Sequence, residues 1–196
     1  MINVVVYWIN NKIDRSDFML EEVKGLPHRV VKDIEGVDSL KVYLVQDFNL
    51  SLLKKMVNFG LDIFGDLGMD QWGLVPQIRH GNVYVLTEEG QHKIVGLAIL
   101  MRDWEDFYKA YLFDYAISED LQGRGLGYEF LKIIAGDLID QGFDKMSLTV
   151  DVNNEPAIRL YRDKIGFESV LYSIDEYGKG EDRYIMELEL ASFVNK

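Results

Sequence analysis

Short apolar runs alternate with helical patterns along this chain, and their order predicts a protein that mixes strands and helices. Apolar residues spaced three and four apart over 51–64 predict an amphipathic helix, with Ser51 as its N-cap. A polar stretch over 16–24 is compatible with another helix. Strands are predicted at 4–8, 42–45, 82–87, 94–101 and 110–117. The last three are joined by short polar connections and should form an antiparallel meander.

The second half of the chain alternates helix and strand. Helices are predicted at 125–141 and 155–165, and strands at 145–152, 169–174 and 184–190. The helix over 125–141 joins two strands as a crossover, so the strands ending at Ile117 and starting at Lys145 should be parallel neighbours. Its predicted buried stripe is Phe130, Leu131, Ile134, Leu138 and Ile139, with Lys132, Asp137 and Asp140 facing water.

Composition narrows the class of protein. The 196 residues show no linker or repeat, which favours one domain over 1–196. With no cysteine, the chain has no disulfide, thiolate metal site or cysteine nucleophile. A net charge of −12 disfavours nucleic acid and anionic membranes as partners. Apolar runs are far shorter than a membrane span and the start lacks a signal sequence, so we expect a cytoplasmic protein.

A glycine-rich loop stands between a predicted strand and a predicted helix. Gly123, Gly125 and Gly127 would permit positive φ and close backbone approach, so that loop N–H groups and the helix dipole could bind a diphosphate. The glycines alone also fit an ordinary flexible turn. Tyr128 replaces the third glycine of a dinucleotide fingerprint, and no Gly-Lys-Ser/Thr of a P-loop follows.

Two segments resemble the motifs of the GNAT acetyltransferase superfamily. The loop Gln122-Gly-Arg-Gly-Leu-Gly127 is similar to its Gln/Arg-x-x-Gly-x-Gly/Ala motif. A downstream segment is similar to a second motif through Asn154, Ala157, Leu160, Tyr161, Gly166 and Phe167. The resemblance covers about 83–190, while 1–41 show nothing specific. It implies an α/β fold with a mixed, centrally splayed β-sheet and helices on both faces.

The resemblance also implies acetyl-CoA as co-substrate, with no metal. The pyrophosphate would lie on the loop amides of Gln122, Gly123, Arg124, Gly125, Leu126 and Gly127. The pantetheine arm would follow the strand at Tyr115, Ala116 and Ile117. Asn154 could cap its helix, bond the pantetheine amides, or do both. Tyr161 on an apolar face could be a core aromatic, but the family match assigns it to the cofactor site and to catalysis.

Without a cysteine for an acyl-enzyme, the simplest mechanism is direct attack of an amine on the thioester. A strand N–H near Ala116 or Ile117 could stabilise the charge that develops on the carbonyl oxygen. Tyr161 could protonate the departing thiolate. Asp114 is the leading candidate for the base, with Glu119 and Asp151 behind it, although any of them could instead be a solvated or paired carboxylate.

The acceptor is the least determined feature. The segment 177–186 resembles the final hairpin of peptide N-terminal and ribosomal-protein alanine acetyltransferases, and of lysine-type amino acid acetyltransferases. Thr149 stands where the peptide enzymes often carry Glu. An acidic rim would favour a small cationic amine or amino acid; it comprises Asp175, Glu176, Glu181 and Asp182.

Alternatives remain at this stage. The acceptor could be a peptide or a protein lysine, or the chain could sense acyl-CoA without turnover. The segment 65–72, with Met69 and Trp72, is expected to line the acceptor pocket, unless Trp72 packs in the core. A homodimer is left open.

Overall fold

A computed structural model describes residues 28–33, 40–88 and 93–195. Eight strands form one sheet, in the order β1-β2-β3-β4-β5-β6-β8-β7. The strands are β1 (His28–Asp33), β2 (Leu40–Val45), β3 (Asn82–Glu88), β4 (Lys93–Arg102), β5 (Lys109–Ile117), β6 (Lys145–Asp151), β7 (Glu168–Ser173) and β8 (Arg183–Glu189). The predicted strand at 4–8 and helix at 16–24 lie outside the described residues.

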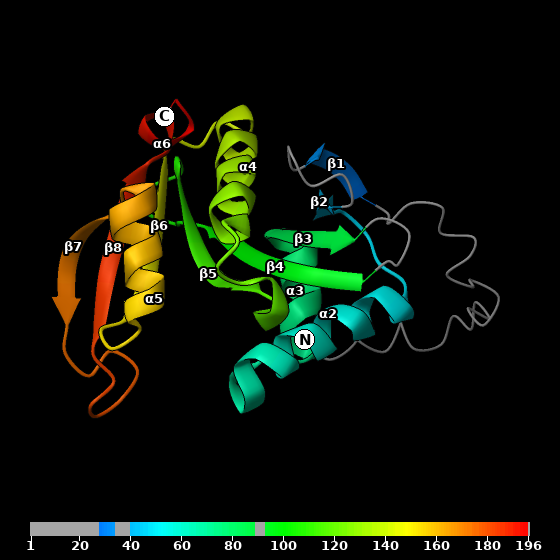
Figure 1. Cartoon of the computed structure of the whole chain (residues 1–196), viewed down its shortest axis with the longest axis horizontal. Helices are drawn as coiled ribbons and strands as arrows, with labels where there is room; N and C mark the ends of the chain where they lie inside the picture. Colours follow the sequence, from blue (N-terminus) through cyan, green and yellow to red (C-terminus); the bar gives the residue numbers. More distant parts are fainter. Residues whose placement is uncertain (1–27, 34–39, 89–92, 196) are drawn as a thin grey trace.

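Helical segments connect these strands (Figure 1). They are α2 (Leu50–Phe64), η2 (Gly65–Leu67), α3 (Gln71–His80), η3 (Glu119–Leu121), α4 (Leu126–Asp140), α5 (Glu155–Ile158), the π-helical turn η4 (Arg159–Ile165) and α6 (Leu190–Val194). The predicted helices and strands within the described residues are confirmed, with shifted ends. The sequence patterns missed β1, α3 and α6. Helix α3 buries only Leu74 and Ile78 and contains Pro76, and α6 has five residues, so both give a weak pattern.

The sheet is mixed, and it is splayed at its centre as expected. Strands β3, β4 and β5 form the predicted antiparallel meander. Strand β5 pairs with β6 in parallel only from Lys109 to Leu112, opposite Lys145 to Leu148. Beyond Leu112 and Leu148 the described parts of β5 and β6 are not paired with each other, so these two strands separate toward their C-terminal ends (Figure 1).

Helices cover both faces of the sheet and define two cores. On one face α4, α5 and η4 pack over the middle strands, with Phe130, Ile134 and Tyr161 in this core. On the other face α2 and α3 pack against β3, β4 and the end of β5, around Met56 and Ile99. The splay between β5 and β6 therefore lies in a sheet that is packed on both faces.

Two details of the helices differ from the sequence analysis. Asn49, not Ser51, caps α2, because its side chain accepts the Leu52 N–H at 2.8 Å. Asp137 was expected to face water, yet it is only 4% exposed, whereas Ile139 is 37% exposed.

Hydrogen bonds explain the burial of Asp137. Its carboxylate accepts the Tyr84 hydroxyl at 2.8 Å and the Gln141 side-chain amide at 2.7 Å. A partnered carboxylate can replace an apolar residue in the core, and periodicity alone cannot detect such a partner from β3.

Candidate active site

A β-bulge marks the point at which β5 leaves β6. Asp114 lies opposite Ile99, and Leu112 lies opposite Leu100, so Phe113 is the extra residue in β5. A bulge of this kind shifts the alternation of side chains by one residue. Leu112 and Tyr115 therefore both face the α4 core, while Asp114 shares the α2 face with Ala116.

The splay leaves particular backbone groups of β5 without a strand partner. Ser118 N–H donates to the Val95 carbonyl of β4 at 2.9 Å. Alternate residues of an antiparallel strand bond the same neighbour, so the N–H groups of Asp114 and Ala116 also face β4. Those of Tyr115 and Ile117 face the gap instead. The sequence suggested the N–H of Ala116 or Ile117 as the group that could stabilise the thioester carbonyl oxygen. The hydrogen-bond pattern favours Ile117 for this role and adds Tyr115 as a second candidate.

The glycine-rich loop turns back onto the end of β5. The side-chain amide of Gln122 donates to the Ile117 carbonyl at 3.0 Å. Gly123 and Gly125 have φ of 75° and 83°, and Gly125 is the N-cap of α4. Gly127 was expected to share this conformation, but its φ is not left-handed. Arg124 is exposed, and Leu126 is buried in the first turn of α4.

Tyr115 ties β5 to the first turn of α4. Its hydroxyl donates to the Gly127 carbonyl, and its ring stacks on Phe130 with centroids 5.6 Å apart. Burial raises the pKa of Tyr115 well above that of a free tyrosine, and the nearby Tyr161 raises it further.

Tyr161 sits in the π-helical turn η4 and is 8% exposed. Its ring meets Phe167 edge to face, with centroids 5.6 Å apart. Its carbonyl accepts the N–H groups of both Gly166 and Phe167 at 2.9 Å, which fixes the turn. Burial raises the pKa of Tyr161, so its hydroxyl keeps its proton at neutral pH. The packing role is therefore confirmed, and the side chain is also in the protonation state that a general acid needs.

Asn154 caps α5, because its side-chain oxygen accepts the Ala157 N–H at 3.2 Å. This confirms the capping interpretation and leaves its amide nitrogen for a further role.

Asp114 is half-buried, and among the described residues it has no hydrogen bond or ion pair. Burial raises its pKa to about 6. A carboxyl group in this state can exchange a proton near neutral pH.

The other candidate carboxylates are in different situations. Asp151 forms an ion pair with Arg183 at 3.0 Å and accepts the Asn153 N–H at 2.7 Å, so it is not a free base. Glu119 is exposed just beyond β5.

The acidic rim is largely engaged in the β7–β8 hairpin itself. Glu181 pairs with Arg183 at 3.0 Å, Asp182 accepts the Tyr172 hydroxyl, Glu176 accepts the Ser173 hydroxyl, and Asp175 accepts the Gly180 N–H at 2.6 Å. These contacts shape the hairpin; of the four, the Glu181–Arg183 ion pair offsets negative charge on the rim, whereas the other three come from neutral donors.

A chain of hydroxyls, not anticipated from the sequence, joins β5 to this hairpin. Tyr111 and Thr149 oxygens are 2.8 Å apart, and Thr149 and Tyr177 oxygens are 3.2 Å apart. Burial chiefly raises the pKa of Tyr111 to about 12. Each bonded pair is 28 or more positions apart in sequence, so it is the pairing of β6 with β5 on one side and with β8 on the other that brings the three residues together.

The segment 65–72 lies at the end of α2, as η2 and the start of α3. Trp72 is 75% exposed, so it does not pack in the core, and Met69 is half-buried against the α2 core. Their place at the acceptor pocket stays a prediction.

Comparisons with known proteins agree with this geometry. The Acetyltransferase (GNAT) family matches residues 54–167, which is more than half of the chain. The protein therefore belongs to the GNAT acetyltransferase family.

Individual relatives are distant. The mycothiol acetyltransferase of Corynebacterium aurimucosum is 37% identical over 51 residues, which are 26% of this chain and 16% of that protein. The structure of Ard1 from Thermoplasma volcanium has a TM-score of 0.65 and 17% identity, covering 77% of this chain and 97% of that one. A GNAT family acetyltransferase from Elizabethkingia anophelis with acetyl-CoA bound has a TM-score of 0.59 and 16% identity, covering 78% and 99%.

Two features are absent from the described residues. None of these helices is long and apolar enough to cross a membrane. No group of three His, Asp or Glu side chains in this part of the chain could hold a metal ion.

Proposed function

We propose that the protein transfers the acetyl group of acetyl-CoA directly to a primary amine, on a small cationic amine or an amino acid. The pyrophosphate would bind the loop amides from Gln122 to Gly127, at the N-terminus of α4. The pantetheine arm would lie in the splay, against the N–H groups of Tyr115 and Ile117. Asn154 would bond its amides from the opposite side.

The observation that carries this proposal is the placement of Asp114. The bulge at Phe113 directs its carboxyl group to the α2 face, next to the strand N–H groups that face the gap. Its pKa of about 6 makes it ionised at neutral pH yet able to hold a proton. A carboxylate without a described partner, beside the proposed thioester site, suits a general base.

The proposed reaction is a single displacement. Asp114 takes a proton from the attacking ammonium, and the amine nitrogen bonds the thioester carbon. The N–H of Tyr115 or Ile117 stabilises the resulting oxyanion. When the C–S bond breaks, Tyr161 donates its proton to the thiolate, and the nitrogen of the intermediate releases its second proton, which returns to Tyr161 through solvent, leaving coenzyme A and the amide.

A specific observation favours the larger acceptor as a second candidate. Leu67 in η2, Trp72 at the start of α3 and Tyr177 on the hairpin are exposed apolar side chains. They could contact a peptide or a protein lysine. A panel of small amines, amino acids and peptides, incubated with labelled acetyl-CoA, separates these acceptors. Binding of acetyl-CoA without any transfer would instead identify a sensing module.

Asp114→Asn tests the base. We expect kcat/KM to fall roughly 10²-fold and to lose the limb that rises with pH through about 6, because the amide cannot accept a proton. The pH profile of kcat/KM measures this. Asp144→Asn, at an exposed carboxylate before β6, serves as control. An unchanged profile in the Asp114 variant would assign the base elsewhere.

Although Asp114→Asn should lower activity, we expect it to stabilise the folded protein at high pH. The pKa of Asp114 is raised from 3.8 to about 6 on folding, so its ionisation lowers the stability of the folded state as pH rises between those values. Asp114→Asn should raise the free energy of unfolding at pH 8 by about 1 to 3 kcal/mol, with little effect at pH 4. Urea denaturation at both pH values measures this difference.

A further inference from the structure

Strand β7 is an edge of the sheet that no other described strand covers. It is the last strand in the sheet order, and Figure 1 shows it at the outside of the molecule. Every residue of β7 except Ser173 is exposed. Four neighbouring apolar side chains at this edge are between 48% and 71% exposed, namely Val170, Leu171, Tyr172 and Ile174.

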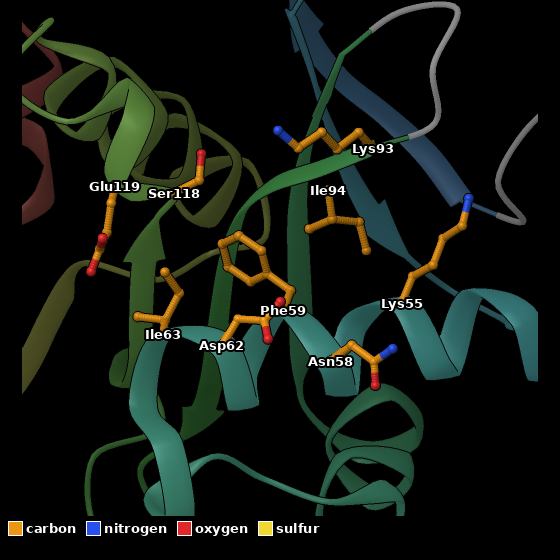
Figure 2. A pocket seen from close by; sticks show the side chains of 9 residues that line it. All are labelled: Lys55, Asn58, Phe59, Asp62, Ile63, Lys93, Ile94, Ser118 and Glu119. Carbon is orange, nitrogen blue, oxygen red and sulfur yellow. The ribbon is translucent and has the colours of Figure 1, made fainter.

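Other parts of the sheet are covered or protected. Figure 2 shows Phe59 of α2 beside Ile94 of β4, and both side chains are buried in the same core. The sequence of β1, at the opposite edge, includes Arg29 and Lys32, and such cations commonly protect sheet edges from pairing. From residue 169 to 173, β7 contains no charged residue and no proline. An exposed, apolar and uncharged edge is a template for another strand.

The alternation of hydrogen bonds shows which backbone groups of β7 point outward. The Val152 N–H donates to the Asp182 carbonyl at 3.4 Å, so Asp182 and the even-numbered residues of β8 face β6. The odd-numbered residues therefore face β7, and one of them, Arg183, lies opposite Ser173. The next residue of β7, Tyr172, consequently directs its backbone N–H and C=O away from β8, to the open edge.

An antiparallel copy of the same strand fits this edge. If a two-fold axis passes through Tyr172, each Tyr172 exchanges both backbone hydrogen bonds with its copy. Leu171 then stands opposite Ser173, and Val170 stands opposite Ile174, so apolar residues meet at both ends of the paired segment.

Local geometry limits the pairing to this short segment. A β-bulge lies between Ser169 and Leu171, and Asp175, with φ of 55°, begins the turn that follows β7. The paired segment is therefore bounded on both sides, and Glu168 and Asp175 lie outside it.

Area and charge favour a second copy as the occupant. Covering the exposed surface of the four apolar side chains in both copies removes on the order of 900 Å² from water, close to the roughly 1,000 Å² of a specific interface. The net charge of −12 makes two copies repel each other, and an uncharged segment is where they can meet at least cost.

We infer that the protein forms a two-fold dimer through β7, in which the two sheets join edge to edge. The small interface predicts association at micromolar concentration. Because salt screens the repulsion between the two acidic chains, the dimer should become tighter as the ionic strength rises.

Analytical ultracentrifugation of the full chain from about 1 to 100 µM tests this inference. We expect the mass to shift from monomer toward dimer, and Ile174→Lys to raise the dimer Kd at least about tenfold, because it places a cation at the paired edge. Leu67→Lys adds the same charge at an exposed apolar residue of η2, and it should leave the Kd unchanged.

Cysteine variants locate the axis, because the chain has no cysteine of its own. A mixture of Leu171→Cys and Ser173→Cys chains should form a disulfide-linked heterodimer under mild oxidation, since these positions face each other with Cα atoms about 4.5 Å apart. Either variant alone places its two cysteines about 8 Å apart across the axis, beyond the reach of a disulfide, and should stay unlinked.

A protein that is monomeric at 100 µM overturns the inference. A dimer that Ile174→Lys leaves intact also overturns it, as does a single cysteine variant that links to itself more readily than the mixture, because both place the interface or its axis elsewhere. A monomer that instead binds an extended peptide along β7 would show that the second copy is the wrong occupant. If Ile174→Lys melts below the wild type, the cysteine variants alone decide.

Discussion

Tyr161 shows how a single residue can serve packing and chemistry together. It is buried against Phe167, and burial raises its pKa, so its hydroxyl carries a proton throughout the neutral range. The raised pKa also makes this hydroxyl a weaker acid than a free tyrosine and places it further above the pKa of about 8.5 of a free thiol, so donation to the thiolate would have to accompany the breaking of the C–S bond. The same desolvation that keeps the ring in the core thus keeps the acid protonated.

We predict that Tyr161→Phe lowers kcat roughly 10²-fold while the Kd for coenzyme A and the melting temperature change little, because only the hydroxyl is lost. Steady-state kinetics, with chemistry shown to be rate-limiting, measures this. The effect should shrink for thioesters whose thiols have a lower pKa.

Tyr128→Phe is the matched control for this change, since Tyr128 also meets a phenylalanine edge to face, at 5.3 Å from Phe193. A Tyr161 variant with normal kcat would leave Tyr161 as a core residue only.

At the scale of elements, the start of α4 depends on backbone conformation more than on side chains. Gly125 caps the helix with φ of 83°, where a residue with a Cβ is strained, although the space around it is open. Gly136 lies in the same helix, also with open space around it, but its φ is not left-handed. Substitutions at these two glycines therefore distinguish the effect of backbone strain in the loop from a general effect on helix α4.

Gly125→Val should raise the Kd for coenzyme A at least about tenfold, because strain and bulk disturb the N–H groups that would bind the pyrophosphate. Gly136→Ala should leave that Kd unchanged and stabilise α4 by up to about 1 kcal/mol. Calorimetric titration and urea denaturation measure the two effects. Equal affinities in two folded variants would exclude the loop as the pyrophosphate site.

At the scale of the whole molecule, two exposed tryptophans lie in segments that the core does not need. Trp72, at the start of α3, is 75% exposed. Trp104 is 91% exposed, in the connection that enters β5 at its paired end. Trp104, an exposed ring at the opposite end of β5, is therefore a suitable control for Trp72, an exposed ring in the segment expected to line the acceptor pocket.

We predict that Trp72→Ala raises the acceptor KM several-fold and changes the free energy of unfolding by less than about 0.5 kcal/mol, because the ring contributes little to the core. Trp104→Ala should leave the acceptor KM unchanged. Kinetics with acetyl-CoA saturating separates the two. A normal acceptor KM in the Trp72 variant would remove the segment 65–72 from the acceptor pocket.

The sequence by itself determined the meander, the crossover that makes β5 and β6 parallel, and the glycine-rich loop before α4. These features depend on residues close together in the chain, whose periodicity and turn chemistry are local. The same locality explains why α3 was missed, since its weak apolar pattern and Pro76 give little signal.

Only the tertiary structure decided which groups face one another. The bulge at Phe113 turns Asp114 to the α2 face, a shift that depends on register with β4 and not on the β5 sequence alone. Asp137 is buried because Tyr84 reaches it from β3, 53 residues away. Asp151 forms an ion pair with Arg183 of β8. Partnership between distant residues sets burial, charge and pKa, and periodicity does not encode it.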